Sequence, residues 1–125
     1  MKNTIIIIAV IQTIFFFMHE FDAFYRKEWK MFKFLSKLKP DTQYIIFLYA
    51  HIPLTFFIFY YMWTVVNFSN FVLWIVVNVF LIFHLLIHLI AVKWESNVFK
   101  SSHSFVFIAG AAVIGISNLL LINYY

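Results

Sequence analysis

The stretch FVLWIVVNVFLIFHLLIHLIAV, residues 71–92, decides the fold class of this chain. It contains no Asp, Glu, Lys or Arg, and at ~1.5 Å of rise per residue a helix of this length crosses a hydrocarbon core of about 30 Å. The run is continuously apolar, whereas a strand of a membrane barrel alternates between apolar and polar residues. We therefore predict a transmembrane helix over residues 71–92.

Three further stretches have the same character, at about residues 5–25, 44–66 and 104–122. The connection over residues 67–70 is short, so the second and third stretches should form a tight antiparallel hairpin. The sequence predicts an all-α fold: an integral membrane four-helix bundle that forms one domain over residues 1–125.

Composition supports a membrane protein and excludes several other classes. The chain is 65% hydrophobic and 11% charged, whereas a soluble domain is nearer half apolar and a quarter charged. Cysteine is absent, which excludes disulfides, thiolate metal sites, iron–sulfur clusters and covalent haem attachment. The net charge is +4, but the basic residues flank apolar stretches. We therefore expect membrane lipids, and not nucleic acid, as the partner of these charges.

The basic residues are strongly biased to one side of the membrane. The two connections that must share a side hold eight of the nine Lys and Arg residues: Arg26, Lys27, Lys30, Lys33, Lys37, Lys39, Lys93 and Lys100. Cytosolic loops of membrane proteins carry such an excess. We predict a multi-pass protein of the cell membrane with these basic loops in the cytosol and both termini outside.

The connection over residues 26–41 is both basic and aromatic. In a helix, Lys30, Lys33 and Lys37 would share one face, and Phe32 and Leu35 another. That pattern is typical of an amphipathic helix lying in the headgroup layer, so we predict an interfacial helix between the first two spans.

All five histidines fall in the predicted cytosolic half of the membrane. Depth below the cytosolic boundary follows from the helix rise, counted from the nearest charged residue at the end of each span. It is about 10 Å for His19, about 15 Å for His51, about 14 Å for His84 and about 8 Å for His88. His103 stands at the boundary itself. Ionisable side chains inside a bilayer are costly and usually functional, so this slab is the candidate site.

The spacing of these residues suggests a metal site. His84 and His88 are i and i+4 on one helix face, and His19 and Asp22 are i and i+3 on another. With His51 from the second helix, the five side chains offer imidazole nitrogens and a carboxylate oxygen. Such a set suits a transition metal, with zinc the first expectation and iron the second.

Three functions remain open from the sequence. A metal-dependent enzyme could act on a lipid or another amphiphile, with Glu20 as general base. A b-type haem could be held between His51 and either His84 or His88, which lie at matched depths. In a non-enzymatic subunit, the histidines would stabilise the bundle or respond to pH, and Asp22 would simply pair with Arg26.

The last span carries small residues at helical spacing. Gly110, Ala111 and Gly115 allow another helix to approach closely, which predicts a packing partner or a homo-oligomer through this helix. Asn78 and Asn118 are expected to form interhelical hydrogen bonds.

The residues His19-Glu20-Phe21-Asp22-Ala23, followed by Glu28-Trp29-Lys30-Met31-Phe32, resemble the H-E-x-D-A and E-W-basic-M-F motifs of a family of small bacterial membrane proteins of unknown function. A looser similarity is to membrane proteins with an H-x-x-E-E motif, from which this chain departs. The resemblance implies a four-helix membrane protein with His19, Glu20, Asp22, Glu28 and Trp29 as motif positions, and it implies no activity.

Overall fold

The computed structural model describes residues 2–94, 96, 98 and 101–121. The described part contains four long α-helices and no strand: α1 (Lys2–Arg26), α2 (Pro40–Asn67), α3 (Phe71–Ala91) and α4 (Ser102–Leu121). Each is long and apolar enough to cross a membrane. The all-α four-helix prediction is confirmed. Lys100 and Ile122, which the sequence placed in a basic loop and at the end of the fourth span, lie outside the described residues.

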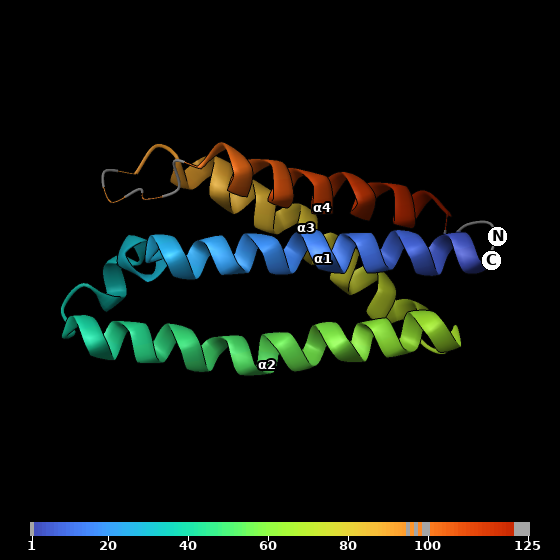
Figure 1. Cartoon of the computed structure of the whole chain (residues 1–125), viewed down its shortest axis with the longest axis horizontal. Coiled ribbons are helices and arrows are strands. Elements are labelled where there is room, and N and C mark those ends of the chain that lie inside the picture. Colours follow the sequence, from blue (N-terminus) through green and yellow to red (C-terminus); the bar gives the residue numbers. More distant parts are fainter. Residues whose placement is uncertain (1, 95, 97, 99–100, 122–125) are drawn as a thin grey trace.

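The helices form an uneven bundle (Figure 1). α4 packs along both α1 and α3, whereas α2 makes fewer contacts with its neighbours. A tight turn joins α2 to α3, with Phe68 in the left-handed region at φ 51° and Asn70 capping α3. From this turn α3 slants toward α4, so α2 and α3 diverge toward the end at which α2 begins (Figure 1). The candidate site lies at this wider end.

A buried polar network holds the four helices together in the half of the bundle nearer the α2–α3 turn. The Gln12 amide on α1 donates to Asn78 on α3 at 2.8 Å and accepts from Tyr61 on α2 and Asn118 on α4, both at 3.1 Å. Asn118 also donates to Asn78 Oδ1 at 3.3 Å. The prediction that Asn78 and Asn118 bond between helices is confirmed. The sequence reading missed Gln12, the residue that joins them.

The small residues of α4 are used inside this chain. A Cβ at Gly115 would lie 3.2 Å from both the Asn78 backbone oxygen and Gln12 Nε2, and one at Gly110 would lie 2.4 Å from the Phe15 ring. Ala111 is buried and accepts a hydrogen bond from Gln12 through its carbonyl. Close packing through α4 is therefore explained within one bundle, and a homo-oligomer through this helix stays a prediction.

The connection between α1 and α2 differs in form from the continuous interfacial helix that its pattern suggested. It contains two short 3-10 helices, η1 (Glu28–Met31) and η2 (Lys33–Leu35), separated by an extended Phe32. Lys27 adopts a left-handed conformation at φ 60°, which turns the chain back under the bundle. The turn buries Trp29, Met31 and Leu35 against the helices, so the segment closes that end of the bundle.

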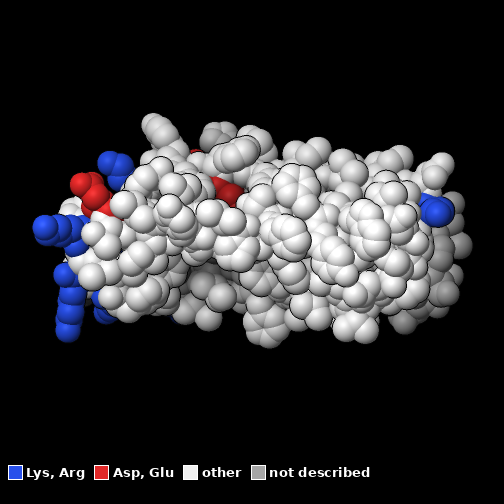
Figure 2. All heavy atoms as spheres, turned by 90° about the horizontal axis from the view of Figure 1, so that it is seen from below, with Lys and Arg blue, Asp and Glu red and all other residues white. Residues whose placement is uncertain are grey.

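Charge is distributed along the molecule as the sequence indicated. Figure 2 shows Lys and Arg side chains gathered at the end where α1 meets α2, and a long uncharged body behind them. Lys2 begins α1 at the opposite end. Some acidic atoms are recessed among uncharged residues, away from the charged end (Figure 2). A carboxylate recessed in an apolar bundle needs a partner, and the histidine cluster supplies candidates for it.

Candidate metal centre

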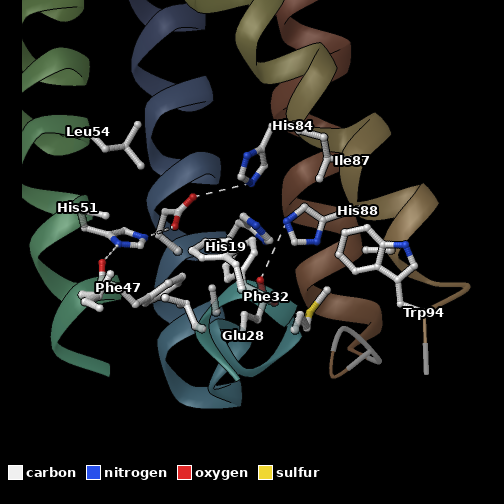
Figure 3. A pocket seen from close by; sticks show the side chains of 18 residues that line it. His19, Glu28, Phe32, Phe47, His51, Leu54, His84, Ile87, His88 and Trp94 are labelled. Atoms are coloured by element: carbon white, nitrogen blue, oxygen red, sulfur yellow. Dashed lines mark hydrogen bonds and ion pairs between the residues drawn. The ribbon is translucent and has the colours of Figure 1, made fainter. Parts of the chain in front are cut away.

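Three of the predicted ligands come together between α1 and α3. His19 lies on α1, and His84 and His88 lie one turn apart on α3. One potential ligand atom from each lies within 4.8 Å of the others, and the ring centroids are 4.8 to 5.0 Å apart. Metal–imidazole bonds are ~2.0 Å long, so small ring rotations bring three nitrogens onto one ion. Figure 3 shows the three rings converging.

Local packing positions each of these rings. His84 and His88 share a face because they are four residues apart on an unbroken helix. Nδ1 of His19 lies 2.8 Å from the Ser104 hydroxyl on α4, which fixes the plane of the ring. Nε2 is then the His19 nitrogen that would coordinate a metal ion. Histidine ligands usually have their other ring nitrogen oriented in this way.

Glu20 lies between this cluster and α2. Its Oε2 is 2.7 Å from His51 Nε2, and its Oε1 is 3.8 Å from His84 Nε2. Oε1 and His84 Nε2 are both buried without a hydrogen-bond partner among the described residues. Their separation is too long for a hydrogen bond but suits two atoms that bind the same cation. These two buried atoms fit a metal ion.

His51 is brought to Glu20 and not to the three histidines. Its Nδ1–H donates to the Phe47 carbonyl oxygen at 2.7 Å, because a carbonyl can only accept. One proton lies between its Nε2 and Glu20. The ring packs against Phe24 and Phe47, with centroids 4.7 and 4.4 Å away. His51 therefore orients the carboxylate of Glu20.

The remaining sequence candidates lie apart from the cluster. Asp22 pairs with Arg26 on its own helix at 3.1 Å, which is the pairing expected under the non-enzymatic alternative. His103 is exposed on the first turn of α4. The structure thus brings together His19, His84 and His88, adds Glu20 with His51 behind it, and leaves Asp22 in a separate ion pair.

Glu28 is the functional candidate that sequence reasoning did not place in the site. It is 5% exposed in η1, and its Oε2 lies 3.9 Å from His88 Nε2. Burial, followed by the charges of Glu20 and Asp22, raises the pKa of Glu28 to about 8. Periodicity gives no signal for such a residue, because an acid in a basic loop normally faces water. Its only signal was the motif resemblance.

A cavity of about 300 Å³ adjoins the cluster. Its back wall is formed by α1, its floor by η1 and η2, and its sides by α2 and α3 (Figure 3). Ile46 and Ala50 on α2, Ile87 on α3 and Trp94 line the sides, and all four are exposed. The lining is almost wholly apolar apart from the histidines and the two glutamates. The cavity therefore opens at the exposed, mostly apolar surface between the diverging helices.

Comparison with known proteins identifies a family but no activity. The profile of a family described as "Family of unknown function (DUF6713)" matches residues 5–125. The chain belongs to this family. No curated protein and no solved structure matches it. For this DUF6713 chain the inference of function must therefore rest on the site itself.

Proposed function

We propose that this DUF6713 protein is a membrane metalloprotein that binds one transition-metal ion and acts on a lipid or another amphiphile. The observation that carries the proposal is the convergence of His19, His84 and His88, with ligand atoms within 4.8 Å of one another inside an apolar bundle. Three imidazoles that meet from two helices at one point are typical of a metal centre.

The acids beside the histidines support a cation over a purely structural cluster. Glu20 and Glu28 approach from opposite sides, at 3.8 Å from His84 and 3.9 Å from His88. Each has a buried carboxylate oxygen with no hydrogen-bond partner among the described residues. A buried carboxyl oxygen without a partner is costly, and coordination of a divalent cation would remove that cost. Helix packing alone does not require either acid.

The donor set favours zinc first and iron second. Three histidines with one position left for water or substrate are the ligands of many catalytic zinc sites. With Glu20 added, the set also suits iron, which accepts histidine and carboxylate ligands in more open geometries. Haem b is less well supported, because Glu20 lies between His51 and His84 and both nitrogens of His51 contact other groups.

The proposed chemistry divides between the metal and Glu20. A zinc ion in such a site supplies Lewis acidity and lowers the pKa of a bound water toward ~7. In the zinc site, where Glu20 is not a ligand, its carboxylate accepts a proton as general base, and His51 holds that carboxylate toward the cluster. The cavity admits apolar groups from the bilayer between α2 and α3 and excludes bulk water from the other sides.

Elemental analysis tests the metal site. Purified wild-type protein should contain about one zinc or iron ion per chain, and His84→Ala should lose most of it. His103→Ala is the matched control, because it removes an exposed histidine outside the cluster. Wild-type protein without metal after refilling with zinc or iron would contradict the proposal and leave a structural or pH-responsive subunit as the better account.

A further inference from the structure

A second hollow lies at the mouth of the metal-site cavity. Its volume is about 370 Å³. Five residues line it: Met31, Phe32, Lys33, Phe34 and Trp94. All of these except Lys33 also line the metal-site cavity, so the two spaces adjoin at these side chains.

The chemistry of this mouth differs from that of the deeper cavity. Lys33 is exposed and is the one charged residue among those lining it, so an anion is favoured there. Trp94 is 39% exposed, and aromatic and lysine side chains are common at the level of lipid headgroups. The deeper walls are apolar, which suits a hydrocarbon chain and not a free anion.

The depth of His88 below the end of α3 gives the distance between the mouth and the histidine cluster. His88 lies five residues before Lys93 on α3, which places it about 8 Å below the loop that follows the helix. A molecule with its head at the mouth would thus have a group several bonds along its chain beside the histidines. Both sites lie on one path, with the polar end outermost.

We infer that the mouth binds the anionic headgroup, a phosphate or carboxylate, of a membrane amphiphile whose chain extends into the cavity toward His84 and His88. The inference rests on the proposed function for the reaction but not for the binding step. The substrate class is then an anionic lipid with a hydrocarbon chain. The group that reacts lies along that chain and not in the headgroup.

Native mass spectrometry of the whole protein tests the inference in a neutral detergent. The probe is dodecyl phosphate, and dodecyltrimethylammonium is the control of opposite charge. We expect the phosphate to saturate at one molecule per chain and Lys33→Glu to weaken its Kd about tenfold, since each surface charge contributes about this scale of attraction. Metal content is measured on the same samples.

Lys37→Glu is the matched control. Lys37 is exposed in the same basic segment but does not line the hollow, so its reversal should change the Kd less than twofold. Equal weakening by both reversals, or equal binding of both probes, would overturn the inference. The phosphate adduct is measured on protein with and without metal. A protein that binds no metal but keeps the adduct would therefore exclude the proposed reaction and retain the headgroup site.

Discussion

The orientation of the His19 ring depends on a residue 85 positions away in the chain, Ser104 on α4. This contact shows how the site is specified residue by residue. His84 and His88 are positioned by their own helix, but His19 needs a partner from another element. Glu20 likewise needs His51 from α2, at 2.7 Å. Removing such partners should change the metal site without removing a ligand.

Ser104→Ala tests this at the residue scale. The variant removes the hydroxyl that fixes His19, and we expect metal affinity to fall about tenfold, at the low end for loss of an orienting partner. Affinity is measured by competition with a chelator of known strength. Ser117→Ala is the control on the same helix, because Ser117 is exposed and, among the described residues, its hydroxyl bonds to the Val113 carbonyl of its own helix. An unchanged affinity for Ser104→Ala would show that the contact does not position His19.

Sequence reasoning located part of this site for a physical reason. His84 and His88 share a face by helical spacing alone, so their pairing could be predicted. That His19 would join them, while His51 would instead contact Glu20, depends on how α1, α2 and α3 rotate about their axes. Single-sequence periodicity in a uniformly apolar helix does not fix that rotation. The position of Glu28 in the site was harder still to predict, because a left-handed turn at Lys27 buries this residue.

At the scale of elements, α4 and α2 have different roles. α4 packs closely on α1 and α3 because Ala111, Ala112 and Gly115 are small and buried or face the polar network. α2 contacts the others less and diverges from α3, which leaves the cavity between them. The first arrangement supports the proposed ligands, and the second provides the proposed route of access.

Gly115→Ala should destabilise the support. Its new methyl group would lie 3.2 Å from the Asn78 backbone oxygen and from Gln12 Nε2, both inside the interhelical network. Overpacking of this kind costs about 1–3 kcal/mol. The free energy of unfolding in mixed detergent micelles measures it. Val113→Ala, at an exposed position on α4, should change stability far less. Equal stability of the two variants would contradict the packing role of Gly115.

Ala50→Trp should close the access route without affecting the ligands. Ala50 lines the cavity from α2, and an indole there would fill the space in front of the histidines. We expect the one-to-one adduct with dodecyl phosphate to be lost while metal content is retained. Ile45→Trp, on the exposed face of the same helix and away from the described cavities, is the control. Retained amphiphile binding in Ala50→Trp would place the chain elsewhere.

At the scale of the whole molecule, the four-helix class followed directly from the apolar runs, and their expected ends agree with the observed helices to within a few residues. α2 begins at Pro40, a few residues before the expected start at about residue 44, because proline is favoured in the first turn of a helix. The divergence of α2 from α3 has no counterpart in the sequence pattern, because it depends on side-chain packing across the bundle.

Membrane orientation can be tested directly because the chain has no cysteine. We expect the basic end to be cytosolic. In intact cells, an impermeant maleimide should label Ser69→Cys, in the turn between α2 and α3, and should spare Ser36→Cys, in the basic connection. Permeabilised cells provide the control, in which both should react. The reverse pattern in intact cells would invert the topology.

The central claim is that His19, His84 and His88 bind one metal ion together. X-ray absorption spectroscopy at the edge of the bound metal tests it most directly, because the outer-shell scattering of imidazole rings counts the histidine ligands. Our account predicts about three imidazoles at ~2.0 Å in the wild type and about two in any metal that His88→Ala retains. A bound metal without imidazole scattering would contradict the account.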